Sequence, residues 1–388
     1  MFGKAEKQQL EKVLRCAIGN KECAGANLMV LKEGKEIFYH EDGYADLEEG
    51  LHIKRNTIFR MYSMTKPVTA AAAMILLERG VIDLYEPVSK FLPGFKNQAV
   101  AEGDQLFSVE REVNVKDLLS MTSGLVYGGN DKAGQETEAF FEEVDGRLLS
   151  DNPVSTFEAM NRLGRCALAF QPGSAWQYGA SADVLGAVIE VAGGMRFGEF
   201  LEKEIFGPLG MKDTAFWVPA EKRNRLAKTY EYDPNGNLTP YFGNHLGIIS
   251  SMDRIPAFES GGAGLVSTID DYARFANMLM NDGNLDGVQI LRPKTVEYMT
   301  NCTLTPEHQK YIWPALGGYS YGNLMRVMTD CSKTGIVSSQ GEYGWDGWLG
   351  AYFCNCPKDK LTFLFMMQKT DSGTTPLTRK LRNIILSS

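Results

Sequence analysis

The sequence predicts an α/β protein whose sheet is built from both ends of the chain, with a mostly helical region inserted between them. Strand patterns occur in the first 90 residues, helical segments separated by proline and glycine dominate residues 91–290, and strand patterns return towards the C-terminus. The simplest architecture is a discontinuous α/β domain of residues 1–90 and 291–388 that packs against a helical domain of residues 91–290. We expect the active site at the junction of the two.

The N-terminal end is expected to contain two helices and a hairpin. Residues 4–19 carry the apolar period of a helix that covers a sheet. Residues 26–31 are mostly apolar and residues 36–39 return after a turn, which is typical of two adjacent antiparallel strands. Residues 67–79 predict a buried helix that Gly80 ends at its C′ position.

The remaining elements follow from the same periodicities. Three helical segments stand out in the middle region: residues 115–121, 182–192 and 270–280. Alternation then predicts a strand over residues 318–328. Two further strand segments and a closing helix complete the chain: residues 351–356, 360–367 and 376–386.

Composition excludes several function classes. The chain has 388 residues, 44% of them hydrophobic and 23% charged, as in ordinary globular proteins. Its net charge of −8 and its lack of a Lys/Arg cluster argue against a nucleic-acid partner. No run reaches the 18 or so apolar residues of a membrane helix, and the N-terminus lacks the apolar core of a signal peptide. We therefore expect a cytoplasmic protein with no membrane partner.

Cysteine and histidine patterns favour reduced thiols and no metal. The seven cysteines are an odd number and scattered. Cys354 and Cys356 face the same side of a predicted strand, but no third or fourth ligand is near them in the sequence. The four histidines are isolated, and no phosphate-binding loop is present. We expect neither a metal site nor a cofactor.

A Ser-x-x-Lys motif lies at the start of the apolar helix, at Ser63-Met64-Thr65-Lys66. Residues three apart share a helix face, so the Lys66 amine can reach the Ser63 hydroxyl. Pro67 supports a helix start near Ser63, which gives this residue the positive end of the helix dipole. Lys66 can take the serine proton only if burial lowers its pKa. Alone, the motif also describes a helix cap followed by a solvated lysine.

Further stretches of the chain make the motif specific. Five segments match one family pattern, beginning with Ser-x-Thr-Lys-Pro-x-Thr-Ala: residues 63–70, 80–93, 118–125, 171–173 and 261–268. Through them the chain resembles the β-lactamase-like serine hydrolases, which include class C β-lactamases and penicillin-binding proteins, over nearly its whole length. The resemblance implies their fold, an antiparallel sheet flanked by helices with a mostly helical inserted domain. It also implies an acyl-enzyme at Ser63.

The resemblance implies a second catalytic element at Tyr178-Gly179-Ala180. In the family a tyrosine is followed two residues on by asparagine or serine, so Tyr178 becomes the partner that passes a proton between Ser63 and the leaving group. Spacing alone does not single it out among 16 tyrosines. Ala180 stands at the substrate-binding position and lacks the amide or hydroxyl that would bind Lys66 and a substrate carbonyl. This departure argues against turnover of β-lactams and peptides.

Two segments compete for the family's third element, a Lys-Thr-Gly or its variant on an edge strand. Lys333-Thr334-Gly335 is a literal match, but it lies 24 residues before Pro357, and its residues are typical of an exposed turn. Trp345-Asp346-Gly347 lies 12 residues before Pro357 and runs directly into a strand. It resembles the Trp-Gly-Gly stretch of the family's esterase members. We favour Trp345.

The choice of Trp345 sets the expected substrate contacts. By resemblance, the backbone N–H groups of Ser63 and Trp348 form the oxyanion hole. Gly347 lets a substrate carbonyl approach the strand edge. Where a lysine would pair with a substrate carboxylate, the indole of Trp345 offers an apolar wall and one donor.

The sequence therefore predicts a serine hydrolase for a small-molecule ester or amide, and we expect a carboxylesterase acting on small esters. Three alternatives stay open: a β-lactamase or D-alanyl-D-alanine peptidase that uses Lys333, an acyltransferase, and a non-catalytic binding protein of the same fold. The sequence contains no Gly-x-Ser-x-Gly elbow and no His-Glu-x-x-His, which argues against an α/β-hydrolase and a zinc protease. It leaves the oligomeric state open.

Overall fold

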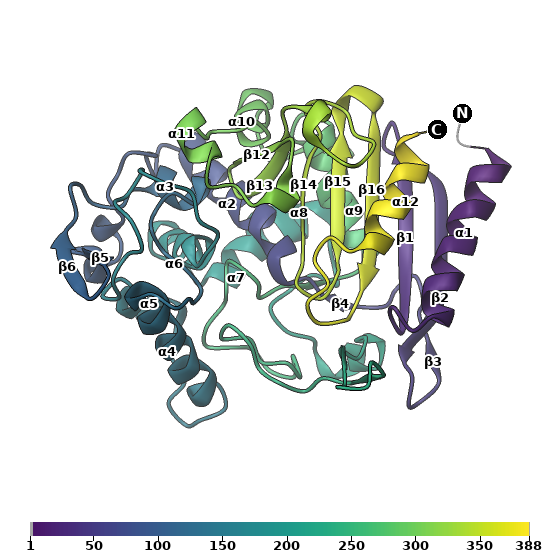
Figure 1. Ribbon diagram of the computed structural model, residues 1–388, viewed down its shortest axis with the longest axis horizontal. Helices are drawn as coiled ribbons and strands as arrows, with labels where there is room; N and C mark the ends of the chain where they lie inside the picture. Colours follow the sequence, from purple (N-terminus) through teal and green to yellow (C-terminus); the bar gives the residue numbers. More distant parts are fainter. Residues whose placement is uncertain (1–2, 388) are drawn as a thin grey trace.

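An eight-stranded sheet made from both ends of the chain organises the computed structural model, which describes residues 3–387 (Figure 1). The strand order is β12-β13-β14-β15-β16-β1-β2-β3, and every neighbouring pair is antiparallel. The strands are β1 (Gly25–Lys32), β2 (Lys35–Asp46), β3 (Leu51–His52), β12 (Tyr319–Gly322), β13 (Met325–Met328), β14 (Tyr343–Asp346), β15 (Tyr352–Cys356) and β16 (Leu361–Met367). The two ends meet where β1 pairs with β16, from Ala26 opposite Met367 to Lys32 opposite Leu361.

One face of this sheet is covered by the terminal helices. Figure 1 shows α1 (Lys4–Gly19, purple) and α12 (Pro376–Leu386, yellow) lying over the strands of the two chain ends. Leu10 and Leu14 of α1 form a buried apolar layer with Leu381 and Ile385 of α12 and with the adjacent strands. Because β1 and β16 are covered on both faces, they are apolar almost throughout. The helices predicted over residues 4–19 and 376–386 are confirmed.

The other face carries α2 (Thr65–Glu78), α9 (Ile269–Met280) and the helical region beyond them. Nearly all of α2 is buried, and its run of four alanines, residues 70–73, lies in the helix that packs against α6 (Ser181–Gly193). Helix α9 comes from the middle of the chain and packs on β16. Gly80, with φ of +66°, follows the C-cap of α2, as the sequence predicts.

Further elements surround α2 and α6. The remaining α-helices in residues 3–387 are α3 (Val115–Ser120), α4 (Lys132–Arg147), α5 (Thr156–Leu163), α7 (Phe197–Leu201) and α8 (Gly207–Leu209) in the helical region, and α10 (Pro293–Met299) and α11 (Pro306–Gln309) after it. The short strand pairs are β4 (Phe59–Arg60) with β9 (Val266–Ser267), β5 (Ala99–Glu102) with β6 (Gln105–Ser108), β7 (Tyr230–Tyr232) with β8 (Leu238–Pro240), and β10 (Asn284–Leu285) with β11 (Val288–Gln289). None of the helices in residues 3–387 has the length and apolarity needed to cross a bilayer.

The strand predicted over residues 318–328 is wrong in one respect, because the segment forms a hairpin of β12 and β13. Asn323 and Leu324 have φ values of 48° and 64°, which place both in the left-handed region of a two-residue turn. The apolar alternation continues through this turn, and Asn-Leu lacks the glycine that usually marks such a turn in a sequence. Periodicity therefore detected the strands but not the reversal between them.

Candidate active site

Ser63 and Lys66 lie where a short 3₁₀ turn, η1 (Tyr62–Met64), passes into α2. Tyr62 has a φ of 43°, an unusual value for a non-glycine residue, at the point where the chain turns from β4 into this helix. The Nζ of Lys66 is 3.2 Å from the Oγ of Ser63. The hydroxyl and the amine that the motif predicts to lie together are therefore adjacent in the structure.

Lys66 is fully buried, and its hydrogen-bond partners within residues 3–387 are two hydroxyls and a carbonyl oxygen, none of them a carboxylate. Its Nζ lies 2.9 Å from the carbonyl oxygen of Gly262, 3.1 Å from the hydroxyl of Tyr127 and 4.6 Å from the centre of the Tyr178 ring. Burial lowers the pKa of Lys66 to about 7, against the opposing influence of the Asp183 carboxylate. A large share of this amine is therefore neutral near pH 7 and able to accept a proton.

Tyr178 lies on the other side of the serine. Its hydroxyl donates to the Oγ of Ser63 at 2.7 Å, and the indole Nε1 of Trp345 donates to the same hydroxyl at 3.2 Å. Burial raises the pKa of Tyr178 well above its usual range, so the side chain is a phenol at neutral pH. Tyr178 can therefore pass a proton on but cannot by itself serve as a phenolate base.

The sequence analysis did not identify two functional candidates, Tyr127 and Asp183. The Tyr127 hydroxyl lies between Lys66 and Asp183 and donates to the Oδ2 of Asp183 at 2.9 Å. The Oδ1 of this buried carboxylate accepts the backbone N–H of Gly262 at 3.0 Å and the hydroxyl of Ser260. Asp183 thus holds both the phenol and the glycine segment that contact Lys66. An acidic residue inside the apolar helix α6 was the one signal available.

Ala180 is buried at the N-cap of α6 and offers no polar side-chain atom to the site. The family pattern places an amide or a hydroxyl here as a partner for the lysine. In this structure Lys66 instead meets the phenol of Tyr127, 53 residues earlier in the chain than Ala180. The departure at position 180 leaves the amine with hydrogen-bond partners but removes a polar group that a substrate amide could use.

The structure separates the two candidates for the third element. Trp345 is buried on β14, and its ring centre is 5.4 Å from that of Tyr178. Lys333 lies on a short turn, Cys331–Lys333, where its side chain is 73% exposed and pairs with Asp330 at 3.1 Å. Trp345 therefore contacts Tyr178, the hydrogen-bond partner of Ser63, whereas Lys333 lines the same cavity as Trp345 but makes no hydrogen bond or ion pair with Ser63, Lys66 or Tyr178 within residues 3–387.

Gly347 and Trp348 follow Trp345 at the end of β14. A Cβ on Gly347 would lie 2.3 Å from the carbonyl oxygen of Met61, so the close approach that requires glycine here is to the segment carrying Ser63. Trp348 lies in the turn after β14, with its ring centre 5.0 Å from that of Tyr62. Within residues 3–387, no backbone acceptor is bound by the N–H of Ser63 or by that of Trp348. Both groups remain available as donors to a ligand.

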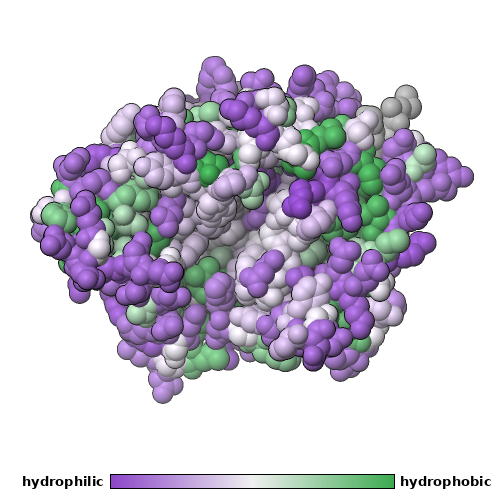
Figure 2. All heavy atoms as spheres, viewed as in Figure 1, coloured by the Kyte–Doolittle hydropathy of each residue, from purple (hydrophilic) through white to green (hydrophobic). Residues whose placement is uncertain are grey.

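The surface is hollowed near the centre of the face in Figure 2, between the helical region and the sheet. A cavity of about 510 Å³ opens beside Trp345. Its wall also includes Trp313 and Tyr319 from the segment before β13, and Thr374 and Arg379 near the start of α12. The volume lies within the range of small-molecule sites.

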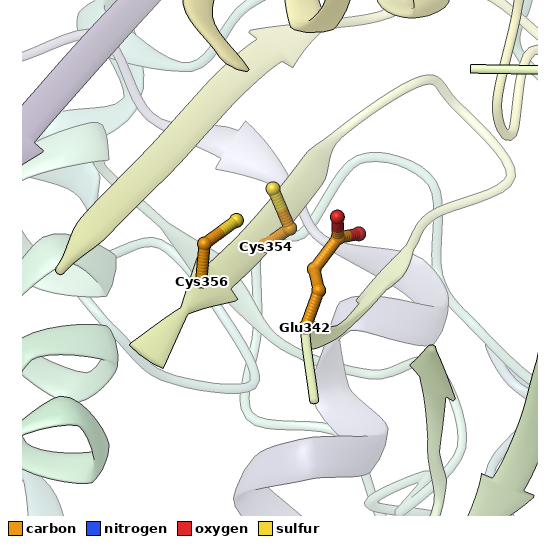
Figure 3. Close-up of side chains that lie close together, drawn as sticks. All are labelled: Glu342, Cys354 and Cys356. Carbon is orange, nitrogen blue, oxygen red and sulfur yellow. The ribbon is translucent and has the colours of Figure 1, made fainter. Parts of the chain in front are cut away.

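Glu342, Cys354 and Cys356 form the one group in residues 3–387 that brings three potential metal ligands within 4.8 Å of one another (Figure 3). The structure thus adds a third side chain to the cysteine pair seen in the sequence, from the residue before β14. However, the carboxylate of Glu342 already accepts hydrogen bonds from Tyr319 at 2.8 Å and from Arg382 at 2.6 Å. We interpret the group as part of a buried structural network.

Comparisons with known proteins show which proteins the chain resembles. The family model described as Beta-lactamase matches residues 8–385. The chain is 33% identical over 356 residues to Protein Rv1367c of Mycobacterium tuberculosis (strain ATCC 25618 / H37Rv), covering 89% of this chain and 86% of that protein. It is 29% identical over 389 residues to Esterase EstB of Burkholderia gladioli, covering 97% and 94% of the two chains.

A solved structure confirms the predicted fold. The structure of EstCE1, described as a hydrolase with promiscuous acyltransferase activity, superposes with a TM-score of 0.85, at 24% identity and with 99% of each chain covered. At this identity the likeness speaks for the fold, which is the β-lactamase/transpeptidase fold with its antiparallel sheet and flanking helices.

Proposed function

The chain belongs to the β-lactamase family of serine hydrolases, and we propose that within this family it is a carboxylesterase that forms an acyl-enzyme at Ser63. One observation carries the proposal. The Oγ of Ser63 lies between the Nζ of Lys66, at 3.2 Å, and the hydroxyl of Tyr178, at 2.7 Å, which is itself 3.2 Å from the indole N–H of Trp345. The likeness to a protein named as an esterase supports it.

In the proposed acylation step, neutral Lys66 accepts the proton of Ser63 while the Oγ attacks the ester carbonyl. The backbone N–H groups of Ser63 and Trp348 donate to the oxygen that becomes negative. When the intermediate collapses, the Tyr178 hydroxyl gives its proton to the departing alkoxide and regains one from the Lys66 ammonium. The products of this step are the alcohol and an acyl group bound to Ser63.

Deacylation uses the same groups in the reverse order. Water attacks the acyl carbonyl while its proton passes through Tyr178 to Lys66. Collapse of the second intermediate breaks the bond to Ser63, and the serine oxygen takes a proton back from Lys66. The carboxylic acid leaves, and the site returns to its starting protonation state.

Two features of the site favour esters over β-lactams and peptides. Ala180 provides no polar partner for a substrate amide. The one donor of Trp345 is hydrogen-bonded to Tyr178, and this side chain has no positive charge that could pair with a substrate carboxylate. The competing cation, Lys333, is exposed and paired with Asp330. A polar substrate that loses such partners can react slower by a factor on the order of 10⁴.

The proposal is tested by comparing substrates on one preparation of the protein. We expect kcat/KM for p-nitrophenyl acetate or butyrate to exceed kcat/KM for nitrocefin and for a D-alanyl-D-alanine peptide. The Ser63→Ala variant serves as the blank for all of them. Faster turnover of nitrocefin than of the esters would assign the protein to the β-lactamases instead.

A further inference from the structure

We propose that the cavity beside Trp345 receives the alcohol group of the ester, and that Trp313 limits how large this group can be. The inference rests on the proposed ester hydrolysis at Ser63. In that reaction Tyr178 donates its proton to the departing alcohol oxygen, so the alcohol group must lie on the Tyr178 side of the serine. Trp313 and Trp345 both contact the ring of Tyr178 and both line the cavity of about 510 Å³, so this cavity begins behind the two indoles and not at Ser63 or Tyr178 themselves.

Trp313 is the exposed member of an aromatic cluster around the catalytic tyrosine. Its ring centre is 5.2 Å from that of Tyr178 and 5.5 Å from that of Trp176. Tyr321 and Trp345 complete the cluster, and they are buried together with Trp176, whereas Trp313 is 44% exposed. Trp313 is therefore the ring that a large ligand would meet first on its way to Tyr178.

Trp313 is carried by residues 311–317, a strap whose backbone hydrogen bonds are local. Within the part of the chain that the structure describes, each joins the strap to itself or to α11. The anchor of α11 is His308, whose Nε2 lies 2.8 Å from the carbonyl oxygen of Gly173. Within residues 3–387, the indole of Trp313 makes ring contacts with Trp176 and Tyr178 and no hydrogen bond. Its replacement therefore removes a wall of the cavity without removing a hydrogen bond from the sheet.

The strap also lines a second cavity. This cavity has a volume of about 570 Å³ and shares Trp313, Pro314, Leu316 and Gly317 with the first. A smaller side chain at position 313 would remove a wall common to both cavities. The volume available beside Trp345 would then increase.

The charges deep in the first cavity are compensated. Arg326 pairs with Asp346 at 3.0 Å, and Arg382 pairs with Glu342 at 2.6 Å. The other cations of the lining lie on its exposed rim: Lys333 and Arg379. With the buried charges paired and two indoles that contact Tyr178 in its wall, the cavity suits an uncharged apolar alcohol such as a phenol or a naphthol.

Acetate esters that differ in the alcohol test the proposal, because they share one acyl-enzyme and kcat/KM then reports the acylation step. Phenyl acetate and 2-naphthyl acetate have leaving groups of similar basicity and different size. For Trp313→Ala we expect the ratio of kcat/KM for 2-naphthyl acetate to that for phenyl acetate to rise roughly tenfold over wild type. Trp313→Phe, which keeps a ring, should change this ratio of kcat/KM values less than Trp313→Ala does. It replaces the alanine variant as the test if that variant does not fold.

Two controls separate the possible outcomes. Tyr311→Ala removes an exposed ring from the same strap, and it should leave the ratio unchanged. A change of acyl chain, phenyl acetate against phenyl hexanoate, should respond to Trp313→Ala much less than the change of alcohol does. An unchanged naphthyl preference in a folded Trp313 variant that still hydrolyses phenyl acetate would overturn this inference alone. Absence of Ser63-dependent ester hydrolysis in the wild type would contradict the proposed function itself.

Discussion

At the scale of single residues, the chemistry depends on how Lys66 loses its charge. Burial lowers its pKa to about 7, while its hydrogen-bond partners are a hydroxyl, a phenol and a carbonyl oxygen. A lysine in bulk water would be charged at neutral pH and could not take the proton of Ser63. The same burial that makes the amine costly to ionise therefore makes it a usable base.

Activity is expected to rise with pH through about 7, since the fraction of neutral Lys66 increases as pH passes its pKa. Lys66→Arg is expected to lower kcat/KM by at least about a thousandfold although it keeps the positive charge, because an arginine in a protein is not deprotonated. The measurement is kcat/KM for p-nitrophenyl acetate between pH 6 and 9. A flat profile together with an active arginine variant would rule out Lys66 as the base.

The phenol of Tyr127 acts on Lys66 rather than on substrate, which makes it a positioning residue in our account. Tyr127→Phe removes an acceptor that favours the ammonium form, so the midpoint of the pH profile should move to lower pH. We also expect kcat to fall about tenfold or more, because the amine loses one of its anchors. Tyr321→Phe is the matched control, since this buried hydroxyl of the same aromatic region has no hydrogen-bond partner among residues 3–387. Equal effects of the two variants would show that Tyr127 contributes packing only.

Sequence and structure differ most in the residues that act through other residues. Ser63 and Lys66 are three positions apart on one helix start, so local geometry alone predicts their contact. Tyr127 contacts the same amine from another segment of the chain, Asp183 contacts Tyr127 in turn, and no local period connects either residue with the motif. The family pattern predicted Tyr178. It also predicted the polar partner of Lys66 at position 180, whereas in the structure Tyr127 contacts the lysine.

At the scale of elements, the position of β14 determines which side chain lies near Ser63 and Tyr178. Its pairing with β15 fixes Trp345 opposite Phe353, and Gly347 then lies against the carbonyl of Met61. The distance of each candidate from Pro357 in the sequence favoured Trp345 over Lys333. In the structure Trp345 lies on β14 against Tyr178, and Lys333 lies on an exposed turn. The hairpin of β12 and β13 could not be predicted in the same way, because Asn323-Leu324 carries no glycine signal.

Variants at the two competing positions test this assignment. Trp345→Ala should change the preference among esters and lower kcat/KM, since it removes the donor to Tyr178 and a wall of the cavity. Lys333→Ala should leave kinetics within about twofold although Lys333 lies on the rim of the cavity, because its side chain is 73% exposed and already paired with Asp330. The measurement is kcat/KM for p-nitrophenyl acetate and butyrate. The reverse pattern would move the third element to Lys333.

At the scale of the whole molecule, antiparallel pairing of β1 with β16 joins the two ends of the chain into one sheet. Helix α2 packs on β14, the strand that carries Trp345, and α6 of the helical region packs on α2. Three segments far apart in the sequence thereby meet: Ser63 and Lys66 at the start of α2, Tyr178 just before α6, and Trp345 on β14. The sheet could be predicted from the sequence because both ends of the chain carry clear strand periodicity. This signal lies in the local sequence and does not depend on long-range contacts.

The proposed mechanism requires that Ser63 is the covalent nucleophile. The most direct measurement is the intact mass of the protein after reaction with a fluorophosphonate, followed by peptide mapping of the adduct and by ester kinetics of Ser63→Ala. We predict one adduct, located on Ser63 and absent from the variant. The variant should remain folded and lose ester turnover by at least about a thousandfold, because Ser63, Lys66 and Tyr178 act as one unit. An adduct on another residue, or full activity in Ser63→Ala, would contradict the mechanism.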